Sequence, residues 1–173
     1  MAHAQHQLTQ LQIKEGDDLE VEDVAVLPLE FVSNLGVGAS GFVEEVKDTI
    51  TSKTYARKSF KALTFNVHKA KEMLHHEVKI IRQLPRHRHV IRVFATYISG
   101  RQLAALLHPV ADEGNLAELL SVIRDLGQSD NAYHRKERDI VWRGFGCLAK
   151  CLDFLHQNRV RHRDIKPSNI LGH

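Results

Sequence analysis

The chain has 173 residues, of which 43% are hydrophobic and 26% are charged, so it has the composition of a globular protein and is not disordered throughout. The formal net charge is +3, from 24 Lys and Arg against 21 Asp and Glu, which is too small to indicate a nucleic-acid-binding protein. The sequence contains no uncharged apolar run long enough to span a bilayer, so we expect no membrane partner. Its two cysteines are too few for a disulfide framework, so we expect an intracellular protein, cytoplasmic or nuclear.

The first 29 residues are predicted to form a flexible N-terminal lead. Residues 1–18 are rich in Gln, His, Lys, Asp and Glu, which is typical of a segment without a packed core. The apolar residues between Leu19 and Leu27 could form a short strand or only a hydrophobic strap, and Pro28 interrupts them.

Five short strands are predicted from Glu30 onward. Each carries β-branched or aromatic residues and is bounded by turn-forming or polar residues, which is typical of a strand. The strands are predicted at residues 31–35, 42–49, 54–60, 90–97 and 102–107.

One amphipathic helix is predicted between the third and the fourth strand. Asn66 is a suitable N-cap, and apolar residues then recur at spacings of three and four up to Pro85, which ends the helix. Two further helices are predicted at residues 115–126 and 136–156, and the second has an apolar face. The expected order is five strands with one inserted helix, followed by a helical segment.

A glycine-rich motif, GxGxxG followed by x-V, occupies residues 36–43. A plain turn between two strands explains it without a ligand. A dinucleotide-binding motif would need a helix directly after the third glycine, whereas the residues after Gly41 alternate like a strand. A loop between two strands can instead fold over a triphosphate, because glycines let backbone N–H groups approach phosphate oxygens closely.

Lys58 and Glu77 are candidates for an ion pair beside this loop. Ala56 and Lys58 share one face of the third strand, whereas Arg57 points to the other. The small Ala56 leaves room for a flat ring, and Lys58 supplies a compact cation for phosphate oxygens. In isolation Lys58 is better explained as a solvated strand lysine, and it is the possible pairing with Glu77 that favours a site. Glu77 could itself be an exposed helix residue.

The segment HRDIKPSN at residues 162–169 is the most specific motif of the chain. Asp164 offers a carboxylate that can accept a hydroxyl proton, and Lys166 offers a positive charge for a transferring phosphoryl group. Asn169 offers an oxygen ligand for Mg²⁺. This pattern is too specific for a chance basic loop.

Taken together, these four features resemble the eukaryotic-type protein kinase domain, and Lys166 resembles its serine/threonine subgroup. The resemblance implies an α+β fold, with a five-stranded antiparallel N-lobe sheet and one inserted helix at residues 30–110. An incomplete helical C-lobe at 111–173 would end in the catalytic loop. The implied reaction transfers the γ-phosphoryl group of ATP to Ser or Thr hydroxyls of a protein substrate, with ATP and Mg²⁺ as cofactors.

The resemblance also implies a role for each site residue. Asp164 would be the catalytic base, Lys166 would contact the γ-phosphate and Asn169 would ligate the metal. Lys58 would hold the α- and β-phosphates and pair with Glu77. The remaining nucleotide contacts would come from the adenine pocket, the phosphate-covering loop and the hinge after His108. These residues would be Leu35, Gly36, Val37, Gly38, Ala39, Ser40, Gly41, Val43, Ala56, Pro109, Val110 and Leu171.

No Asp-Phe-Gly sequence follows Asn169, so the resemblance leaves the principal Mg²⁺-binding aspartate unassigned. We therefore expect a kinase domain truncated after the catalytic loop, with negligible activity on its own. The apolar face of residues 136–156 predicts a protein partner that covers it. Cys147 and Cys151 on this helix are expected to be core thiols and not a zinc site.

Two alternatives remain open on the sequence alone. A pseudokinase-like module could bind a nucleotide or a partner protein without catalysis. A small-molecule phosphotransferase of similar fold is less favoured, because such proteins rarely carry HRDxKPxN.

Overall fold

The computed structural model describes residues 10–38, 41–60, 67–125 and 132–173. The chain divides into two compact units, which are described separately. One comprises Met1–Ile81 and Arg92–Val110, and the other comprises Arg82–Ile91 and Ala111–His173.

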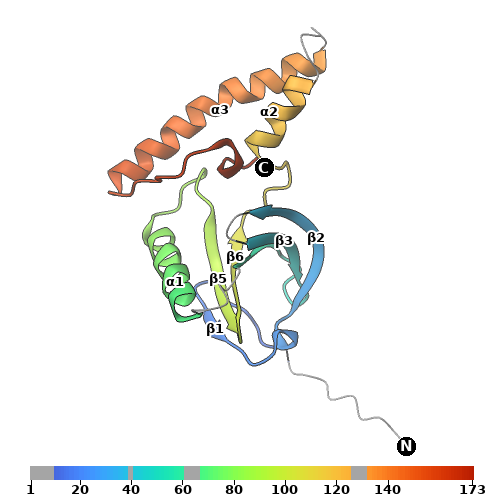
Figure 1. The fold of residues 1–173 in the computed structure, drawn as a ribbon, viewed down its shortest axis with the longest axis vertical. Helices are drawn as coiled ribbons and strands as arrows, with labels where there is room; N and C mark the ends of the chain where they lie inside the picture. The colour runs from blue at the N-terminus through green and yellow to red at the C-terminus, as the bar shows by residue number, and fades with distance from the viewer. Residues whose placement is uncertain (1–9, 39–40, 61–66, 126–131) are drawn as a thin grey trace, which may run out of the picture. The chain divides into compact units, whose positions relative to one another are not determined.

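The first unit is built on a six-stranded sheet with the strand order β1-β5-β6-β4-β3-β2 (Figure 1). Strands β2 to β6 pair antiparallel, as the sequence predicted, whereas β1 pairs in parallel with β5. The strands are β1 (Asp18–Glu20), β2 (Leu29–Gly38), β3 (Gly41–Asp48), β4 (Thr54–Phe60), β5 (Arg92–Ser99) and β6 (Gln102–His108).

The prediction of a purely antiparallel five-stranded sheet is therefore incomplete, because it lacks β1. This strand has three residues, of which only Leu19 is apolar, so it shows no alternating pattern. Its place in the sheet depends on backbone pairing with a strand far along the chain, which no local pattern reports.

The described part of the expected flexible lead is ordered, which corrects the prediction for residues 10–29. Ile13 and Leu27 are each 4% exposed, and the backbone N–H of Gly16 donates to the carbonyl of Phe94 at 2.7 Å. This N-terminal segment, residues 10–28, includes the short 3₁₀ helix Val24–Val26. It covers one face of the sheet.

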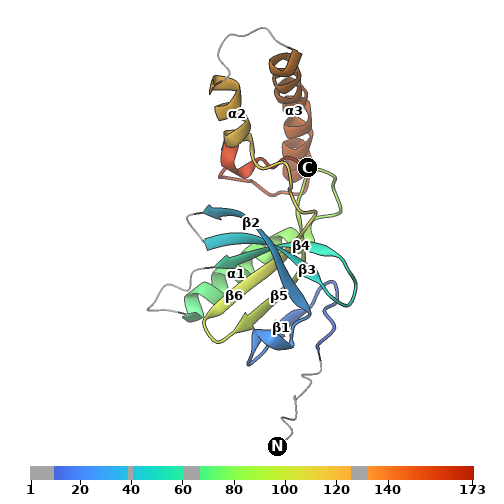
Figure 2. The ribbon, with the colours of Figure 1, turned by 90° about the vertical axis from the view of Figure 1, so that its right-hand side faces the viewer.

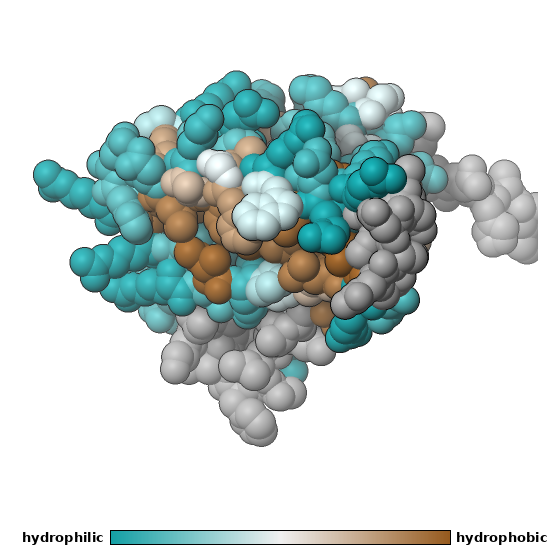
Figure 3. All heavy atoms as spheres, turned by 90° about the horizontal axis from the view of Figure 1, so that it is seen from above, coloured by the Kyte–Doolittle hydropathy of each residue, from teal (hydrophilic) through white to brown (hydrophobic). Residues whose placement is uncertain are grey.

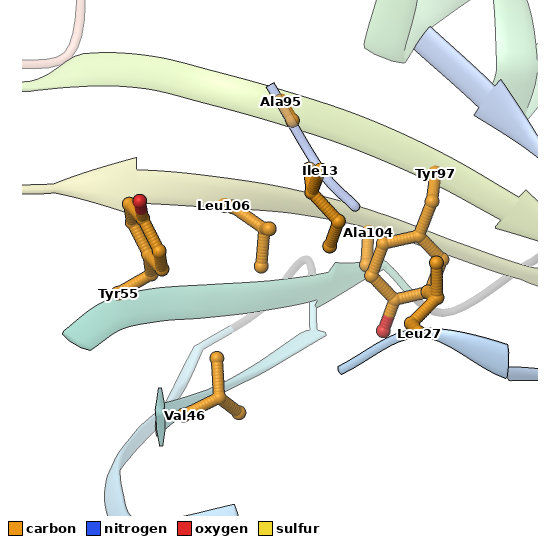
Figure 4. Close-up of a cluster of buried hydrophobic side chains, with 8 residues drawn as sticks. All are labelled: Ile13, Leu27, Val46, Tyr55, Ala95, Tyr97, Ala104 and Leu106. Atoms are coloured by element: carbon orange, nitrogen blue, oxygen red, sulfur yellow. The ribbon is translucent and has the colours of Figure 1, made fainter. Parts of the chain in front are cut away.

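The core under the N-terminal segment contains side chains from four strands. Figure 4 shows Leu27 beside the ring of Tyr97, with Ile13 among the strand residues. The cluster consists of Ile13, Leu27, Val46, Tyr55, Ala95, Tyr97, Ala104 and Leu106.

Helix α1 (Val67–Gln83) packs on the other face of the sheet (Figure 2). Leu74 and Val78 of this helix belong to one buried cluster with Leu103 and Ala105 of β6. Residues 104 and 106 of β6 belong to the opposite cluster, so the alternation along one strand supplies both cores. The predicted N-cap, Asn66, lies outside the described residues.

The second unit contains α2 (Leu116–Asp125), α3 (Ala132–Gln157) and the 3₁₀ turn Pro167–Asn169. Helices α2 and α3 lie side by side (Figure 2). Asn115 caps α2: its Oδ1 accepts hydrogen bonds from the backbone N–H groups of Ala117 at 3.0 Å and Glu118 at 3.2 Å. Residues 82–91 contact α3 through the ring of His87, which stacks on Phe154 at 4.3 Å between centroids.

Large apolar side chains of α3 are exposed. Trp142 is 70% exposed and Phe145 is 59% exposed, and Figure 3 shows apolar residues gathered in a band on the face seen from above. Cys147 is also exposed, because no described residue covers it, so the expectation of a core thiol is wrong for this residue. Cys151 is half-buried. No described helix combines the length and the apolar character needed to cross a membrane.

Candidate functional site

The glycine-rich motif joins β2 to β3 as a hairpin in which Gly38 pairs with Gly41. A Cβ atom at Gly41 would lie 1.8 Å from the backbone oxygen of Ser59, so this position requires glycine for packing against β4. Gly36 has a φ of +155° with open space around it. Ala39 and Ser40 lie outside the described residues.

Three of the residues proposed to contact the nucleotide, Val43, Ala56 and Lys58, share one face of the sheet. Val43 on β3 lies directly opposite Lys58 on β4, and Ala56 precedes Lys58 by two residues on the same strand. Ala56 is 5% exposed and contributes little bulk there. Arg57 pairs instead with Glu44, with 2.7 Å between Nη2 and Oε2, on the opposite face.

Lys58 and Glu77 are brought together by β4 and α1. Lys58 Nζ lies 3.4 Å from Glu77 Oε1, and the two side chains are 27% and 53% exposed. The same ammonium lies 5.0 Å from the ring centroid of Phe60. Analysis of the sequence did not identify Phe60, although a lysine and an aromatic residue two positions apart in a strand necessarily share a face.

The residues expected to form the hinge follow β6 directly. His108 ends the strand, its peptide bond to Pro109 is cis, and Pro109 and Val110 are half-buried at the end of the first unit. The ring of His108 makes an edge contact with that of Tyr55 at 6.3 Å between centroids.

Three polar side chains converge in the segment of residues 162–169 in the second unit. Lys166 Nζ lies 2.9 Å from Asp164 Oδ2, and Asn169 Nδ2 donates to the same oxygen at 2.8 Å. Asn169 Nδ2 also donates to the backbone oxygen of Asp164 at 2.8 Å. Arg163, immediately before Asp164, has a φ of +62°, so the chain turns sharply there.

The charge on Asp164 is stabilised by these neighbours. The hydrogen bond from Lys166, followed by that from Asn169, lowers the pKa of the Asp164 carboxyl below its usual value. Asp164 is therefore ionised at neutral pH and can accept hydrogen bonds but not donate them.

The loop is anchored to the start of α2 just after Asn169. The N–H of Leu116 donates to the carbonyl of Ile170 at 2.8 Å, and the N–H of Gly172 donates to the carbonyl of Gly114 at 2.9 Å. Leu171 forms an isolated β-bridge with Asn115, and its side chain is 51% exposed. The residue that caps α2 thus also anchors the chain just after the HRDIKPSN segment.

The sequence-predicted site residues therefore form two sets. The first unit brings together Val43, Ala56, Lys58 and Glu77 near the glycine-rich hairpin, and the second unit brings together Asp164, Lys166 and Asn169.

The first unit also contains a pocket of about 460 Å³ that the sequence did not suggest. It lies between the N-terminal segment and the sheet, with Leu27, Leu29, Arg57 and Tyr97 among its walls, and includes none of the predicted site residues. Arg57 is already neutralised by Glu44, so this pocket has no unpaired cation for a phosphate. Among the described residues, no cluster of three or more His, Cys, Asp or Glu side chains could hold a metal ion.

Comparison with known proteins gives a consistent family. The protein kinase domain model matches residues 29–173. The chain is 30% identical over 151 residues to serine/threonine-protein kinase TIO of Arabidopsis thaliana, with 87% of this chain and 10% of that protein covered. It is 31% identical over 142 residues to serine/threonine-protein kinase max-2 of Caenorhabditis elegans, with 82% and 20% covered. It is 29% identical over 140 residues to MAP kinase-activated protein kinase 2 of Mus musculus, with 79% of this chain and 32% of that protein covered. The chain therefore spans less than a third of the length of each of these three relatives.

Proposed function

The chain belongs to the protein kinase domain family, and from this premise we propose that it carries the nucleotide-binding and catalytic-loop parts of a serine/threonine protein kinase. The reaction is transfer of the γ-phosphoryl group of ATP to a Ser or Thr hydroxyl of a protein substrate. The observation that carries this proposal is the grouping of Lys166 and Asn169 around the carboxylate of Asp164.

Asp164 is proposed to act as the base. As the substrate oxygen forms its bond to the γ-phosphorus and the bond from phosphorus to the β,γ-bridging oxygen breaks, a carboxylate oxygen of Asp164 accepts the hydroxyl proton. The hydrogen bond from Asn169 orients this carboxylate. The ammonium of Lys166, which lies 2.9 Å from Asp164, is proposed to neutralise charge on a phosphoryl oxygen bound beside that carboxylate.

The first unit offers groups that fit a nucleotide. The ammonium of Lys58, oriented by Glu77, is proposed to hold the α- and β-phosphates. The hairpin of residues 36–41 would cover the phosphates, and Val43 and Ala56 offer an apolar surface beside Lys58 for the adenine ring. Leu35, Leu171 and the backbone of Pro109 and Val110 would complete the adenine contacts.

Asn169 fits a role as a Mg²⁺ ligand. Its amide nitrogen is engaged by Asp164, which leaves the amide oxygen as the end that can coordinate a cation. Mg²⁺, when bound, supplies positive charge that neutralises the phosphates. The 173 residues contain no Asp-Phe-Gly sequence, so we expect this chain alone to bind nucleotide but to transfer phosphoryl groups negligibly.

A binding experiment tests the proposal in the full chain. We expect ATP to bind, as measured by isothermal titration, and Lys58→Ala to weaken binding about tenfold or more, because a charge-assisted phosphate contact is lost. Lys47→Ala removes an exposed lysine of the neighbouring strand β3 and is the matched control, which should leave the affinity unchanged. Equal effects of both variants, or no ATP binding at all, would exclude the proposed nucleotide site.

A non-catalytic nucleotide-binding or interaction module is the second candidate. The exposed side chains of Trp142 and Phe145 offer a surface for a protein partner. Transfer of labelled phosphate from ATP to a Ser/Thr peptide, abolished in Asp164→Asn, would exclude this second candidate and would also overturn the negligible activity expected above.

A further inference from the structure

The ring of Phe60 lies beneath the ammonium of Lys58, with 5.0 Å between Nζ and the ring centroid. We propose that Phe60 is a positioning residue, which holds the Lys58 ammonium where it can meet phosphate oxygens. The proposal rests on the function proposed above for Lys58. It adds a residue outside the glycine-rich, strand-lysine, helix-glutamate and HRDxKPxN motifs.

The ion pair with Glu77 is a weak restraint on Lys58 by itself. The two charged atoms are 3.4 Å apart and the Glu77 side chain is 53% exposed, so water and salt screen the attraction. A lysine side chain has four rotatable bonds, and a partner of this kind does not restrict it to one conformation. A second contact is needed to fix the ammonium.

The face of an aromatic ring provides such a contact. It carries partial negative charge and attracts an ammonium within about 6 Å of its centroid. Because Lys58 and Phe60 are two residues apart on β4, both side chains project from the same face, and the ring lies next to the lysine stem. The Lys58 ammonium is therefore attracted by two groups, the Glu77 carboxylate and the Phe60 ring.

Phe60 is itself held in place by the first unit. Its side chain packs against the cluster that includes Leu74 and Val78 of α1, which flank Glu77 in the helix. Its backbone lies opposite Leu103, which is fully buried, in the neighbouring strand. The ring is therefore a fixed platform, and it links the packing of α1 to the position of Lys58.

The backbone of Phe60 also contacts the end of the glycine-rich hairpin. Gly41 pairs with Phe60 across β3 and β4, and a Cβ atom at Gly41 would lie 3.2 Å from Phe60 Cα. Phe60 thus lies where the proposed phosphate-covering loop, the proposed phosphate-binding lysine and the helix with Glu77 meet. A residue at this junction can set all three in a binding-ready arrangement before nucleotide arrives.

The test compares ring loss with and without Lys58 in the full chain. Phe60→Leu removes the ring face but keeps apolar packing, and Phe60→Tyr keeps the face. We expect Phe60→Leu to raise the dissociation constant for ADP about 2- to 5-fold, the effect of one cation–π contact, and Phe60→Tyr to leave it within error. In a Lys58→Met background, Phe60→Leu should have no further effect.

A measurement without nucleotide separates this inference from the proposed function. Chemical shifts of the Lys58 ε-methylene group, in a chain with ¹³C-labelled lysine, should show an upfield ring-current shift that Phe60→Leu abolishes and Phe60→Tyr retains. If Phe60→Leu does not fold, Phe60→Met gives the same comparison.

Two results would overturn the positioning role. One is an equal loss of ADP affinity on Phe60→Leu with and without Lys58, which would mean that Phe60 acts through packing alone. The other is an unchanged Lys58 shift in the variants that lack the ring. A wild-type chain that shows the ring-current shift but binds no ADP would support the contact and contradict the nucleotide-binding function.

Discussion

The two units of the chain are stabilised in different ways. In the first, the sheet is covered on both faces, by α1 and by the N-terminal segment, and buried clusters fill both interfaces. In the second, Leu155 is the only buried apolar residue among those described, and α2 has none. The arrangement of Asp164 and Asn169 is instead held by short-range hydrogen bonds, and the chain that follows them bridges to Asn115.

This difference indicates that the free energy of unfolding comes mainly from the first unit, whereas the arrangement of charged groups depends on the second. Buried apolar area is the dominant favourable term in folding. Hydrogen bonds at exposed positions add little net stability but fix direction. Substitutions in the two units should therefore differ in both size and kind of effect.

The largest expected effect is from Leu106→Ala. Leu106 is fully buried in the cluster under the N-terminal segment, so the substitution removes buried methyl groups and leaves a cavity. We expect the free energy of unfolding to fall by about 3–4 kcal/mol, measured by urea denaturation. Phe145→Ala, which truncates a larger side chain that is 59% exposed, should change it by less than about 1 kcal/mol. Comparable losses for both would break the contrast between the units.

Ile13→Ala tests whether the N-terminal segment belongs to the core of the first unit. Ile13 is 4% exposed, and we expect a loss of about 2–3 kcal/mol in the same denaturation experiment. The control is Leu11→Ala, because Leu11 is 41% exposed in the same segment. An Ile13→Ala variant as stable as the control would restore the interpretation of this segment as a flexible lead.

Asn115→Ala should have a smaller effect, confined to the second unit. The substitution removes the cap of α2, whose loss typically costs about 1 kcal/mol. Because the bridge to Leu171 is made by the backbone of residue 115, fraying of the first turn of α2 should loosen it as well. We expect faster amide hydrogen exchange in α2 and at residues 170–172, with exchange in β5 and β6 unchanged. Val122→Ala, on an exposed position of α2, should not reproduce this pattern.

The smallest expected effect is on the titration of Asp164. Because Lys166 lowers its pKa, Lys166→Met should raise the pKa of Asp164 towards the usual value of 3.8, followed by NMR of the carboxyl carbon. The folded chain binds this proton less tightly than the unfolded chain. Ionised Asp164 therefore stabilises the fold above its unfolded-state pKa, and the contribution is lost as the pH falls through the lower, folded value.

Lys136→Met is the control for this titration, because it removes an exposed lysine of α3. It should leave the Asp164 pKa unchanged. An Asp164 pKa that is the same in the wild type and in Lys166→Met would contradict the contact between the two side chains.

The sequence predicted the elements that carry a strong local pattern. Strands β2 to β6 and the three helices follow from alternation and from helical spacing, and the pairing of Lys58 with Glu77 was a stated possibility. Asp164, Lys166 and Asn169 could be expected to lie close together because they belong to one short segment, and the structure brings them together; their catalytic roles stay predictions.

The features that sequence analysis missed depend on contacts between distant residues. β1 has no alternation of its own, and the burial of Ile13 depends on strands more than 30 residues away in the chain. Cys147 lies on a helix face that its apolar neighbours suggested would be covered. The placement of the Lys58 ammonium over Phe60 needs the side-chain conformation, which a residue pattern does not contain.

The parallel pairing of β1 with β5 also bears on how this sheet avoids aggregation. An open sheet has two edges whose unpaired backbone groups can recruit strands from other molecules. Here β1 is added at one edge and is only three residues long, and the strand at the other edge, β2, has register shifts after Phe31 and after Asn34. Irregular or very short edges are poor templates for intermolecular pairing, so both margins of the sheet disfavour self-association.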